Sequence, residues 1–216
     1  MTDKAFLKTL DYAVLQPDAS METLLKAAAF CLTYGVGCLC VKSCDVRFAA
    51  ECLRDSKTTV AAVVGFPHGN TLGTLKAMEA QLAAAHGADE IDMVVNISAL
   101  KDGDTECVTD EIQAVVTAVW PRPVKVILET CLLTPAEIRK GVACAVKAKA
   151  AFVKTSTGFA AHGATPEAVQ IMLKAAKGKI KVKASGGIRT RADAEAYLAM
   201  GCERLGVGNV ACLLTK

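Results

Sequence analysis

The sequence alternates between short runs typical of β-strands and longer stretches typical of amphipathic helices, and this alternation limits the folds open to the chain. The strand-like runs are rich in valine and isoleucine and are bounded by glycine, proline or polar residues. They are YAVL (12–15), VGCLCV (36–41), TVAAVVGF (59–66), EIDMVV (90–95), VKVILE (124–129), AFVKT (151–155), IKVKAS (180–185) and ERLGVG (203–208). Strands joined by helices predict an α/β fold with a parallel sheet, because parallel neighbours need a long crossover connection.

The stretches between these runs carry helix signals. Residues 21–32 repeat apolar side chains near the 3.6-residue helical period. TPAE at 134–137 combines a capping threonine, a proline in the first turn and a glutamate that completes a capping box. Similar helix openings occur at 165–167 and 190–193.

Two closures suit a parallel sheet of this kind: an open, doubly wound sheet or an eight-stranded (β/α)8 TIM barrel. No G-x-G-x-x-G follows the first strand, so a dinucleotide-binding fold lacks its main support. Eight strand–helix units of about 27 residues would use all 216 residues, near the lower length limit of the barrel. We predict a single TIM-barrel domain over residues 1–216, with a short N-terminal extension and no linker.

Composition excludes several classes of protein. Hydrophobic residues make up 52 % of the chain and charged residues 22 %, so a sizeable core is available and disorder is not expected. The net charge of +3 and the absence of long like-charge runs argue against nucleic-acid binding. The N-terminal MTDKAFLKTL lacks a secretory pattern, and no 18 consecutive apolar residues suggest a membrane span. We expect a cytoplasmic protein that binds neither nucleic acid nor membrane.

The ten cysteines are expected to be reduced core residues, because most lie in apolar runs and no secretory signal precedes them. Cys38, Cys40 and Cys44 form C-x-C-x3-C, which is not a usual zinc spacing, and no second Cys or His pair stands nearby. We therefore expect no metal site.

Two lysines stand out because each follows an apolar strand and precedes a turn of small residues. Lys154 precedes TSTG and Lys183 precedes ASGG. Taken alone, a lysine at a strand end is usually solvated. On neighbouring strands of one barrel, however, the two would share the rim where active sites form. A second cation and burial both lower the pKa of a lysine, and a neutral amine can form a Schiff base with a carbonyl substrate.

Asp92 is the third candidate. In EIDMVVN its side chain alternates with Ile91 and Met93, whose apolar face suits packing against helices, so Asp92 would point into the barrel. The same pattern also fits a half-solvated antiparallel strand, and the strand alone does not separate these interpretations.

Glycine pairs follow the last two strands. Gly186 and Gly187 come after the seventh, and Gly206-Val207-Gly208-Asn209 comes after the eighth. In a TIM barrel a phosphate group often binds at these two loops, where glycines let backbone N–H groups approach it. Turns need glycine anyway, so each pair alone is a weak signal.

KTSTGF, KASGGIRT, ADEIDMVVN and VGFPHGN together resemble the class I deoxyribose-phosphate aldolases, in the same order and over nearly the whole chain. The resemblance implies a TIM-barrel catalytic domain and a lyase of deoxyribose phosphate catabolism. Such an enzyme reversibly cleaves 2-deoxy-D-ribose 5-phosphate to D-glyceraldehyde 3-phosphate and acetaldehyde, without metal or cofactor. It also implies that Lys154 forms the Schiff base, that Lys183 favours the neutral amine, and that Asp92 is the acid/base group.

The resemblance further implies a set of residues that contact substrate or phosphate. These are Thr157, Gly158, Gly186, Gly187, Gly208, Asn209 and Cys40. Cys40 is expected to be a wall residue, since no histidine partner is evident. Glu129 could orient active-site groups or pair with a lysine, and His68 lies in a loop expected at the same rim. A homodimer or homotetramer is also implied.

The sequence departs from the family at three places, one of which is Lys42-Ser43, where a proline is common. The stretch Asp11-Tyr12-Ala13-Val14-Leu15-Gln16-Pro17 keeps only three of the residues usual there, and the last loop has Gly208-Asn209 where a serine pair is common. Two alternatives therefore stay open: a related Schiff-base aldolase with a different aldehyde substrate, and a non-catalytic barrel that binds a sugar phosphate.

Overall fold

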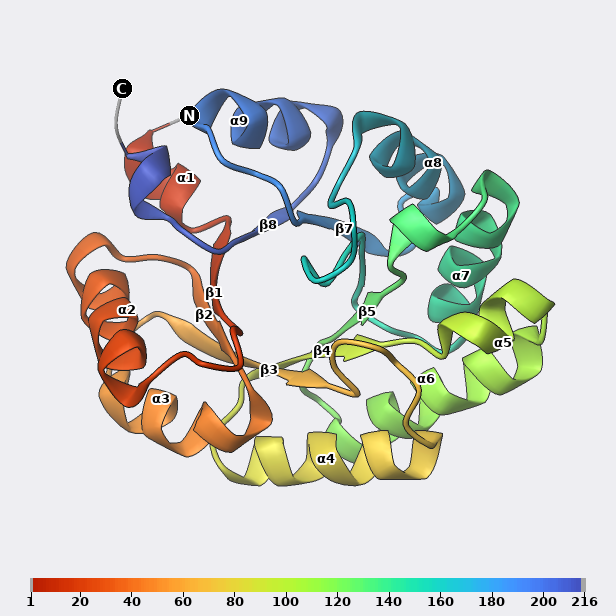
Figure 1. The fold of residues 1–216 in the computed structure, drawn as a ribbon, viewed down its shortest axis with the longest axis horizontal. Helices are drawn as coiled ribbons and strands as arrows, with labels where there is room; N and C mark the ends of the chain where they lie inside the picture. Colours follow the sequence, from red (N-terminus) through yellow and green to blue (C-terminus); the bar gives the residue numbers. More distant parts are fainter. Residues whose placement is uncertain (1, 215–216) are drawn as a thin grey trace.

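We describe residues 2–214 of the protein from a computed structural model. Within these residues eight parallel strands form a closed barrel, in which each strand pairs with the next and β8 pairs with β1 (Figure 1). The strands are β1 (Leu10–Val14), β2 (Cys38–Val41), β3 (Thr59–Val64), β4 (Glu90–Val94), β5 (Val124–Ile127), β6 (Phe152–Lys154), β7 (Lys181–Ser185) and β8 (Arg204–Val207). The predicted barrel is confirmed, and strand order around it follows the sequence.

Helices form a ring outside the strands (Figure 1). They are α1 (Asp3–Leu7), α2 (Met21–Tyr34), α3 (Val46–Cys52), α4 (Gly73–Ala85), α5 (Ile97–Asp102), α6 (Thr105–Val119), α7 (Pro135–Lys147), α8 (Pro166–Ala176) and α9 (Arg191–Met200). The predicted capping box is present: the Thr134 side chain accepts from the backbone N–H of Glu137, whose carboxylate accepts from the backbone of Thr134. Thr165 and Thr190 cap the N-termini of α8 and α9, where their side chains accept from the backbone N–H groups of Ala168 and Asp193. Helix α1 is the short N-terminal extension.

The strands are mostly shorter than the apolar runs that predict them. VGCLCV, for example, becomes a strand only at Cys38, because the backbone crosses another segment closely at Gly37. A Cβ atom there would lie 2.2 Å from the carbonyl oxygen of Lys8. The first strand instead begins earlier than predicted, because β1 starts at Leu10, two residues before the predicted run.

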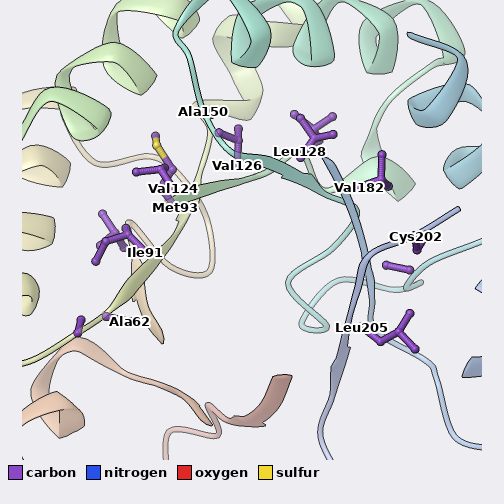
Figure 2. Packing of buried hydrophobic residues seen from close by; sticks show 14 of the residues in the cluster. Ala62, Ile91, Met93, Val124, Val126, Leu128, Ala150, Val182, Cys202 and Leu205 are labelled. Carbon is purple, nitrogen blue, oxygen red and sulfur yellow. The ribbon is translucent and has the colours of Figure 1, made fainter. Parts of the chain in front are cut away.

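The main hydrophobic core lies between the strands and the helices. Alternate strand residues such as Ile91, Met93 and Val126 point outward and are fully buried (Figure 2). Burial of an aliphatic side chain of this size contributes about 1.5–3 kcal/mol. This layer leaves the other residues of each strand to face the barrel interior.

The interior has two chemically different parts. Toward β1, β2 and β3 it is lined by a small apolar cluster, Leu15, Cys38, Cys40, Ala61 and Val63. Elsewhere it holds charged side chains joined in an ion-pair network of Asp11, Glu90, Asp92, Lys125, Lys154, Lys183 and Arg204. Charges buried this deeply are tolerated only when they are paired.

The cysteines are less uniformly placed than their apolar surroundings suggest. Cys31, Cys38, Cys40, Cys144 and Cys202 are buried as predicted, whereas two others, at 44 and 107, are exposed on helical segments. Across residues 2–214, every helix is too short or too polar to traverse a lipid bilayer.

Candidate active site

Lys154 and Lys183 lie side by side inside the barrel. Lys154 is the last residue of β6, and Lys183 is its register partner in β7. Lys183 is not the strand end that the sequence predicts, because β7 continues through Ser185. The two residues are 3 % and 0 % exposed, so neither is a solvated surface lysine.

Both lysines donate to one carboxylate oxygen. The Nζ atoms of Lys154 and Lys183 lie 2.9 Å and 2.7 Å from Oδ2 of Asp92, in β4. Asp92 is fully buried and points inward, as its strand alternation predicts. The structure therefore brings the three residues predicted to do chemistry into one hydrogen-bonded group.

A third lysine completes the surroundings of Asp92. Lys125 of β5 donates to Oδ1 at 2.7 Å and is itself fully buried. Burial alone would raise the pKa of the Asp92 carboxyl, but the ammonium groups of Lys125, Lys154 and Lys183 outweigh it and hold the pKa well below its usual range. Asp92 is therefore ionised at neutral pH.

A second carboxylate fixes the protonation of Lys183. Asp11 of β1 contacts Lys183 Nζ and accepts from Arg204 Nε at 2.7 Å. Burial would lower the pKa of Lys183, but the carboxylates of Asp11 and Asp92 reverse this effect and raise it. Asp11 in turn has its pKa lowered from 3.8 to about 2, since Lys183, Lys125 and Arg204 outweigh desolvation by burial. Lys183 consequently keeps its proton.

Lys125, Arg204 and Glu90 are missed by sequence inspection. Lys125 contacts Glu90 and Asp92, and Arg204 contacts Asp11 and lies 3.5 Å from Glu90. The sequence does hold a pattern that involves Lys125. In VKVILE its side chain is on the same face of the strand as that of Ile127. In the barrel, Lys125 is the register partner of Asp92. Finding it required the register of two strands and not one motif.

Asp11, Cys38 and Glu90 place one oxygen or sulfur atom each within 4.8 Å of the others, a spacing that a metal ion could use. The two carboxylates already face Lys125 and Arg204. Burial and the neighbouring carboxylates also raise the pKa of the Cys38 thiol well above its usual value, so a thiolate ligand is disfavoured. The chain's own cations supply the charge compensation at this place.

Glu129 orients the segment after β6. Its backbone has a positive φ of 58°, and its buried carboxylate accepts hydrogen bonds from the backbone N–H and hydroxyl of Thr157. Burial raises the pKa of Glu129, against the effect of the bonds from Thr157. Of its two suggested roles, the geometry favours orienting the site, since its bonds go to Thr157.

Lys154 and Lys183 line a cavity of about 230 Å³. Most of the residues predicted to contact substrate line it: Cys40, Thr157, Gly158, Gly186, Gly187 and Gly208. Asp92 does not, because it lies behind Lys154 and Lys183. Burial raises the pKa of Cys40 to about 11, which suits a wall residue and not a thiolate nucleophile.

The loops after β6 and β7 are pressed together beside this cavity. A Cβ atom on Gly163 would lie 2.2 Å from the carbonyl carbon of Gly186, so the backbones meet directly. The backbone N–H of Ala164 reaches the carbonyl oxygens of Ser185 and Gly186 at 3.0 and 3.1 Å. This contact sets the position of the Gly186-Gly187 turn.

Asn209 does not line the cavity of about 230 Å³, although it is predicted to contact substrate or phosphate together with the residues that do. It lines a neighbouring cavity of about 410 Å³ that shares Gly187, Ile188 and Gly208 with the first. Arg189, which sequence inspection overlooked, lines the same space. Gly206 also differs from prediction, since it lies within β8 and not in the loop after it.

A second neighbouring cavity, of about 480 Å³, lies on the other side of the segment 157–160. His68 and Glu129 line it, so His68 is at the predicted face of the barrel but outside the main cavity. Thr157 and Phe159 line both cavities.

Comparison with known proteins places this geometry in a family. The sequence model described as "DeoC/LacD family aldolase" matches residues 3–210. A protein of Clostridium perfringens strain SM101 named deoxyribose-phosphate aldolase is 44 % identical over 207 residues, covering 95 % of this chain and 92 % of the relative. The protein of the same name from Listeria welshimeri is 44 % identical over 200 residues, covering 92 % and 90 %.

Solved structures agree in fold. A protein of Coccidioides immitis superposes with a TM-score of 0.96 at 34 % identity, over 99 % of this chain and 85 % of the other. The deoxyribose phosphate aldolase of Aeropyrum pernix, described as tetrameric, superposes with a TM-score of 0.92 at 28 % identity, over 99 % and 91 %. With a buried Lys–Lys–Asp group at the predicted end of the barrel and matches over nearly its full length, the chain belongs to the DeoC/LacD family of aldolases.

Proposed function

We propose that the protein is a class I deoxyribose-phosphate aldolase, a lyase that reversibly cleaves 2-deoxy-D-ribose 5-phosphate to D-glyceraldehyde 3-phosphate and acetaldehyde. One observation carries the proposal: Lys154 and Lys183 share a single oxygen of buried Asp92 at the floor of a small cavity. Relatives above 40 % identity bear the name of this activity.

The reaction begins at Lys154, whose side chain lines the cavity. Its neutral amine attacks the aldehyde carbon of the open-chain sugar, and loss of water leaves an iminium ion. Lys183 favours the neutral amine by like-charge repulsion, since its own proton is held by Asp11 and Asp92.

Cleavage uses the iminium ion as an electron sink. The bond between C2 and C3 breaks as the C3 hydroxyl loses its proton to ionised Asp92 through a bridging water, because Asp92 lies behind the cavity wall. D-glyceraldehyde 3-phosphate leaves with its new carbonyl group. The enamine that remains on Lys154 takes up a proton at carbon, and hydrolysis of the resulting iminium releases acetaldehyde.

The phosphate group is held by the glycine-containing loops that line the cavity. Backbone N–H groups of Gly158, Gly186, Gly187 and Gly208 are available there, and Thr157 adds a hydroxyl group to the wall. Asn209 and Arg189 line the adjoining cavity, where they contribute donors to a phosphate at its border. Binding energy from this remote group fixes the reacting carbon atoms at Lys154.

Treatment with acetaldehyde and borohydride tests the chemistry. Borohydride reduces the iminium to a stable secondary amine, so mass spectrometry of the digest should find an ethyl group on Lys154. No adduct would leave only a barrel that binds sugar phosphates. Cleavage of deoxyribose and of its 5-phosphate should differ strongly in KM. Equal KM values would favour a related Schiff-base aldolase with a different aldehyde substrate.

We also infer that residues 1–216 act as one catalytic domain, although Met1, Thr215 and Lys216 lie outside the described residues. Pairing of β1 with β8 supports this, since an aspartate of the first strand supports a lysine of the seventh. We expect the reaction to use side-chain amine and carboxyl groups and no metal or cofactor.

We further infer that two or four copies assemble in the cytoplasm. Helix α4 and the residue before it turn four large apolar side chains to solvent, Leu72, Leu75, Met78 and Leu82, each at least 48 % exposed. Apolar patches of this kind are often buried in assembly, and the Aeropyrum pernix relative is described as a tetramer. Light scattering on the purified protein should give the mass of a dimer or tetramer, and a monomer would contradict the inference.

A further inference from the structure

Glu129 stands where the chain leaves β5, beside the segment that contains the Schiff-base lysine. The residues on either side of it donate backbone N–H bonds to the carbonyl oxygens of Lys154 and Thr155, at 3.0 and 2.9 Å. The backbone of Glu129 itself is left-handed, with a φ of 58°. This conformation is unfavourable for a residue with a Cβ atom, and it persists where the surrounding structure holds it, often at a functional site. The two backbone bonds therefore fix Glu129 against the end of β6.

The carboxylate of Glu129 takes both hydrogen-bond donors of Thr157. The backbone N–H of Thr157 lies 3.3 Å from Oε2, and the Thr157 hydroxyl donates to the same oxygen. That hydroxyl has one hydrogen, so its oxygen is left as an acceptor, and the backbone N–H of Phe159 donates to it at 3.1 Å. Glu129 is 2 % exposed and Thr157 is 7 % exposed, so little water competes for these bonds. One buried carboxylate thus sets the conformation of the turn 157–159.

The same bonds decide which donors of this turn remain for a ligand. The N–H groups of Thr157 and Phe159 are engaged, and the Thr157 hydroxyl has no hydrogen left to donate. Gly158 lies between them and lines the cavity of about 230 Å³, and within residues 2–214 its N–H donates to no protein acceptor. Its φ of 87° costs a glycine little. The turn therefore offers the Gly158 N–H as its remaining donor.

Gly158 lies next to the loop after β7. A Cβ atom on Gly186 would be 3.5 Å from the Cα atom of Gly158, and both glycines line the same cavity together with Gly208. Donors from three loops thus border one small space. Glu129 does not line this cavity, so any effect that it has on a ligand there passes through Thr157.

We propose that Glu129 is a positioning residue for the phosphate group: by holding Thr157, it places the Gly158 N–H among the donors of the loops after β7 and β8. The proposal rests on the aldolase function proposed above. The charge of Glu129 gives the proposal a distinctive sign. A carboxylate repels a nearby phosphate, so on charge alone the loss of Glu129 should strengthen phosphate binding. If Glu129 positions Gly158, its loss should weaken phosphate binding even though an anion is removed.

The test compares cleavage of 2-deoxy-D-ribose 5-phosphate with cleavage of 2-deoxy-D-ribose. In Glu129→Leu, the ratio of kcat/KM for the first to that for the second should fall at least about 10-fold, because a misplaced donor loses its hydrogen bond to a charged group. Competitive inhibition by inorganic phosphate should weaken in parallel. Glu129→Gln keeps one acceptor oxygen and should show a smaller fall. Ser98→Ala, at an exposed residue that lines the cavity of about 480 Å³ together with Glu129, should keep the parent ratio.

A second substitution tests whether the effect passes through Thr157. Thr157→Val removes the hydroxyl group but keeps the shape of the side chain, so it should also lower the ratio. Glu129→Leu in the Thr157→Val background should lower it little further, because the two residues act through one set of bonds. Losses that multiply, or a ratio in Glu129→Leu that is unchanged or raised, would overturn the proposal. If Glu129→Leu does not fold, Glu129→Gln and Thr157→Val decide by the same ratio.

Borohydride trapping separates this proposal from the function on which it rests. Acetaldehyde carries no phosphate, so the parent enzyme and Glu129→Leu should both trap it on Lys154. A parent enzyme that traps none would remove the aldolase function itself. A folded Glu129→Leu variant that traps none would overturn only the present proposal, because Glu129 would then support Lys154 and not the phosphate. A parent enzyme that traps acetaldehyde but cleaves both sugars equally well would also overturn it, since it has no preference for phosphate.

Discussion

At Asp92, the Nζ atoms of three lysines share two carboxylate oxygens, and one of the three belongs to Lys154, the proposed Schiff-base lysine. Lys125 is bound to Oδ1, so Lys154 and Lys183 share Oδ2. In the proposed mechanism Lys154 reacts as a neutral amine with two N–H groups and keeps one of them as an iminium ion, and Lys183 remains to hold the aspartate in place. Each residue of the group thus has a separate task.

Replacement of Lys154 tests whether this residue forms the Schiff base. Lys154→Ala should reduce cleavage of deoxyribose 5-phosphate to background and abolish borohydride trapping, because among residues 2–214 the other amine that lines the cavity belongs to protonated Lys183. Circular dichroism should show an intact barrel. Loss of folding instead would identify Lys154 as a structural lysine.

Replacement of Lys183 tests whether this residue favours the neutral amine of Lys154. Lys183→Leu removes the neighbouring cation that favours the neutral amine, so the pH optimum of cleavage should move upward. The pH profile of kcat/KM checks this, with Lys181→Leu as a control at a half-exposed lysine two residues away that pairs with Glu203. If both variants keep the parent profile, Lys183 has no part in setting the reactive form.

The limits of sequence inspection are clear at this scale. Lys154, Lys183 and Asp92 could be identified because each lies in a local sequence motif, in or at the end of a strand. Asp11 and Arg204 could not, since 193 positions separate them and they meet only when β8 pairs with β1. Side-chain parity within one strand gives the face of a residue, but its partners depend on the register of neighbouring strands.

Among the elements, the loop between β3 and α4 is held by a buried ion pair on the outside of the barrel. Lys76 of α4 donates to Glu111 of α6 at 2.7 Å and to the carbonyl oxygen of Val94 at 2.9 Å. The loop passes directly over this pair: a Cβ atom on Gly65 would lie 2.9 Å from Lys76 Cε. The pair therefore links the start of the loop to the end of the strand that carries Asp92.

A double-mutant cycle should expose the cost of breaking this pair. Lys76→Met leaves the 6 % exposed Glu111 without its cation, which should lower the free energy of unfolding by about 3–5 kcal/mol. Lys76→Met with Glu111→Leu should recover most of the loss, because two apolar groups replace two paired charges. Urea unfolding measures all four proteins. Equal losses in the single and double variants would mean that packing and not charge is responsible.

A buried ion pair between two helices is difficult to predict from the helix sequences. A lysine and a glutamate on amphipathic helices are usually assigned to the solvent face, and nothing in the spacing of Lys76 or Glu111 distinguishes them from exposed residues. The strand–helix alternation, by contrast, was sufficient for the barrel, because it depends on periodicity within each element. Element ends were less predictable, as at Gly37, where a contact with a distant segment delays the strand.

For the whole molecule, the buried carboxylates make stability depend on pH. The pKa of Asp11 is 3.8 ordinarily and about 2 in the folded protein, so the folded state binds fewer protons in acid than the unfolded state. Its contribution, about 2 kcal/mol, is fully present above about pH 4 and is lost as the pH falls toward 2.

Unfolding measured by urea at a series of pH values between 2 and 6 checks this expectation. The parent protein should lose stability steeply below about pH 4. Asp11→Asn should be less stable at pH 6 but should lose less on acidification. A variant with the same dependence on pH as the parent would show that Asp11 does not carry this part of the acid sensitivity.

The ion-pair network also has a consequence for electroneutrality. Its members are the carboxylates of Asp11, Glu90 and Asp92 and the cations of Lys125, Lys183, Arg204 and Lys154. With every group ionised, four positive charges face three negative ones. The proposed reaction uses Lys154 as a neutral amine, and with that amine the network sums to zero. Formation of the iminium ion would add one positive charge, so the barrel interior carries an excess cation only while substrate is bonded to Lys154 and its anionic phosphate group lies in the same cavity.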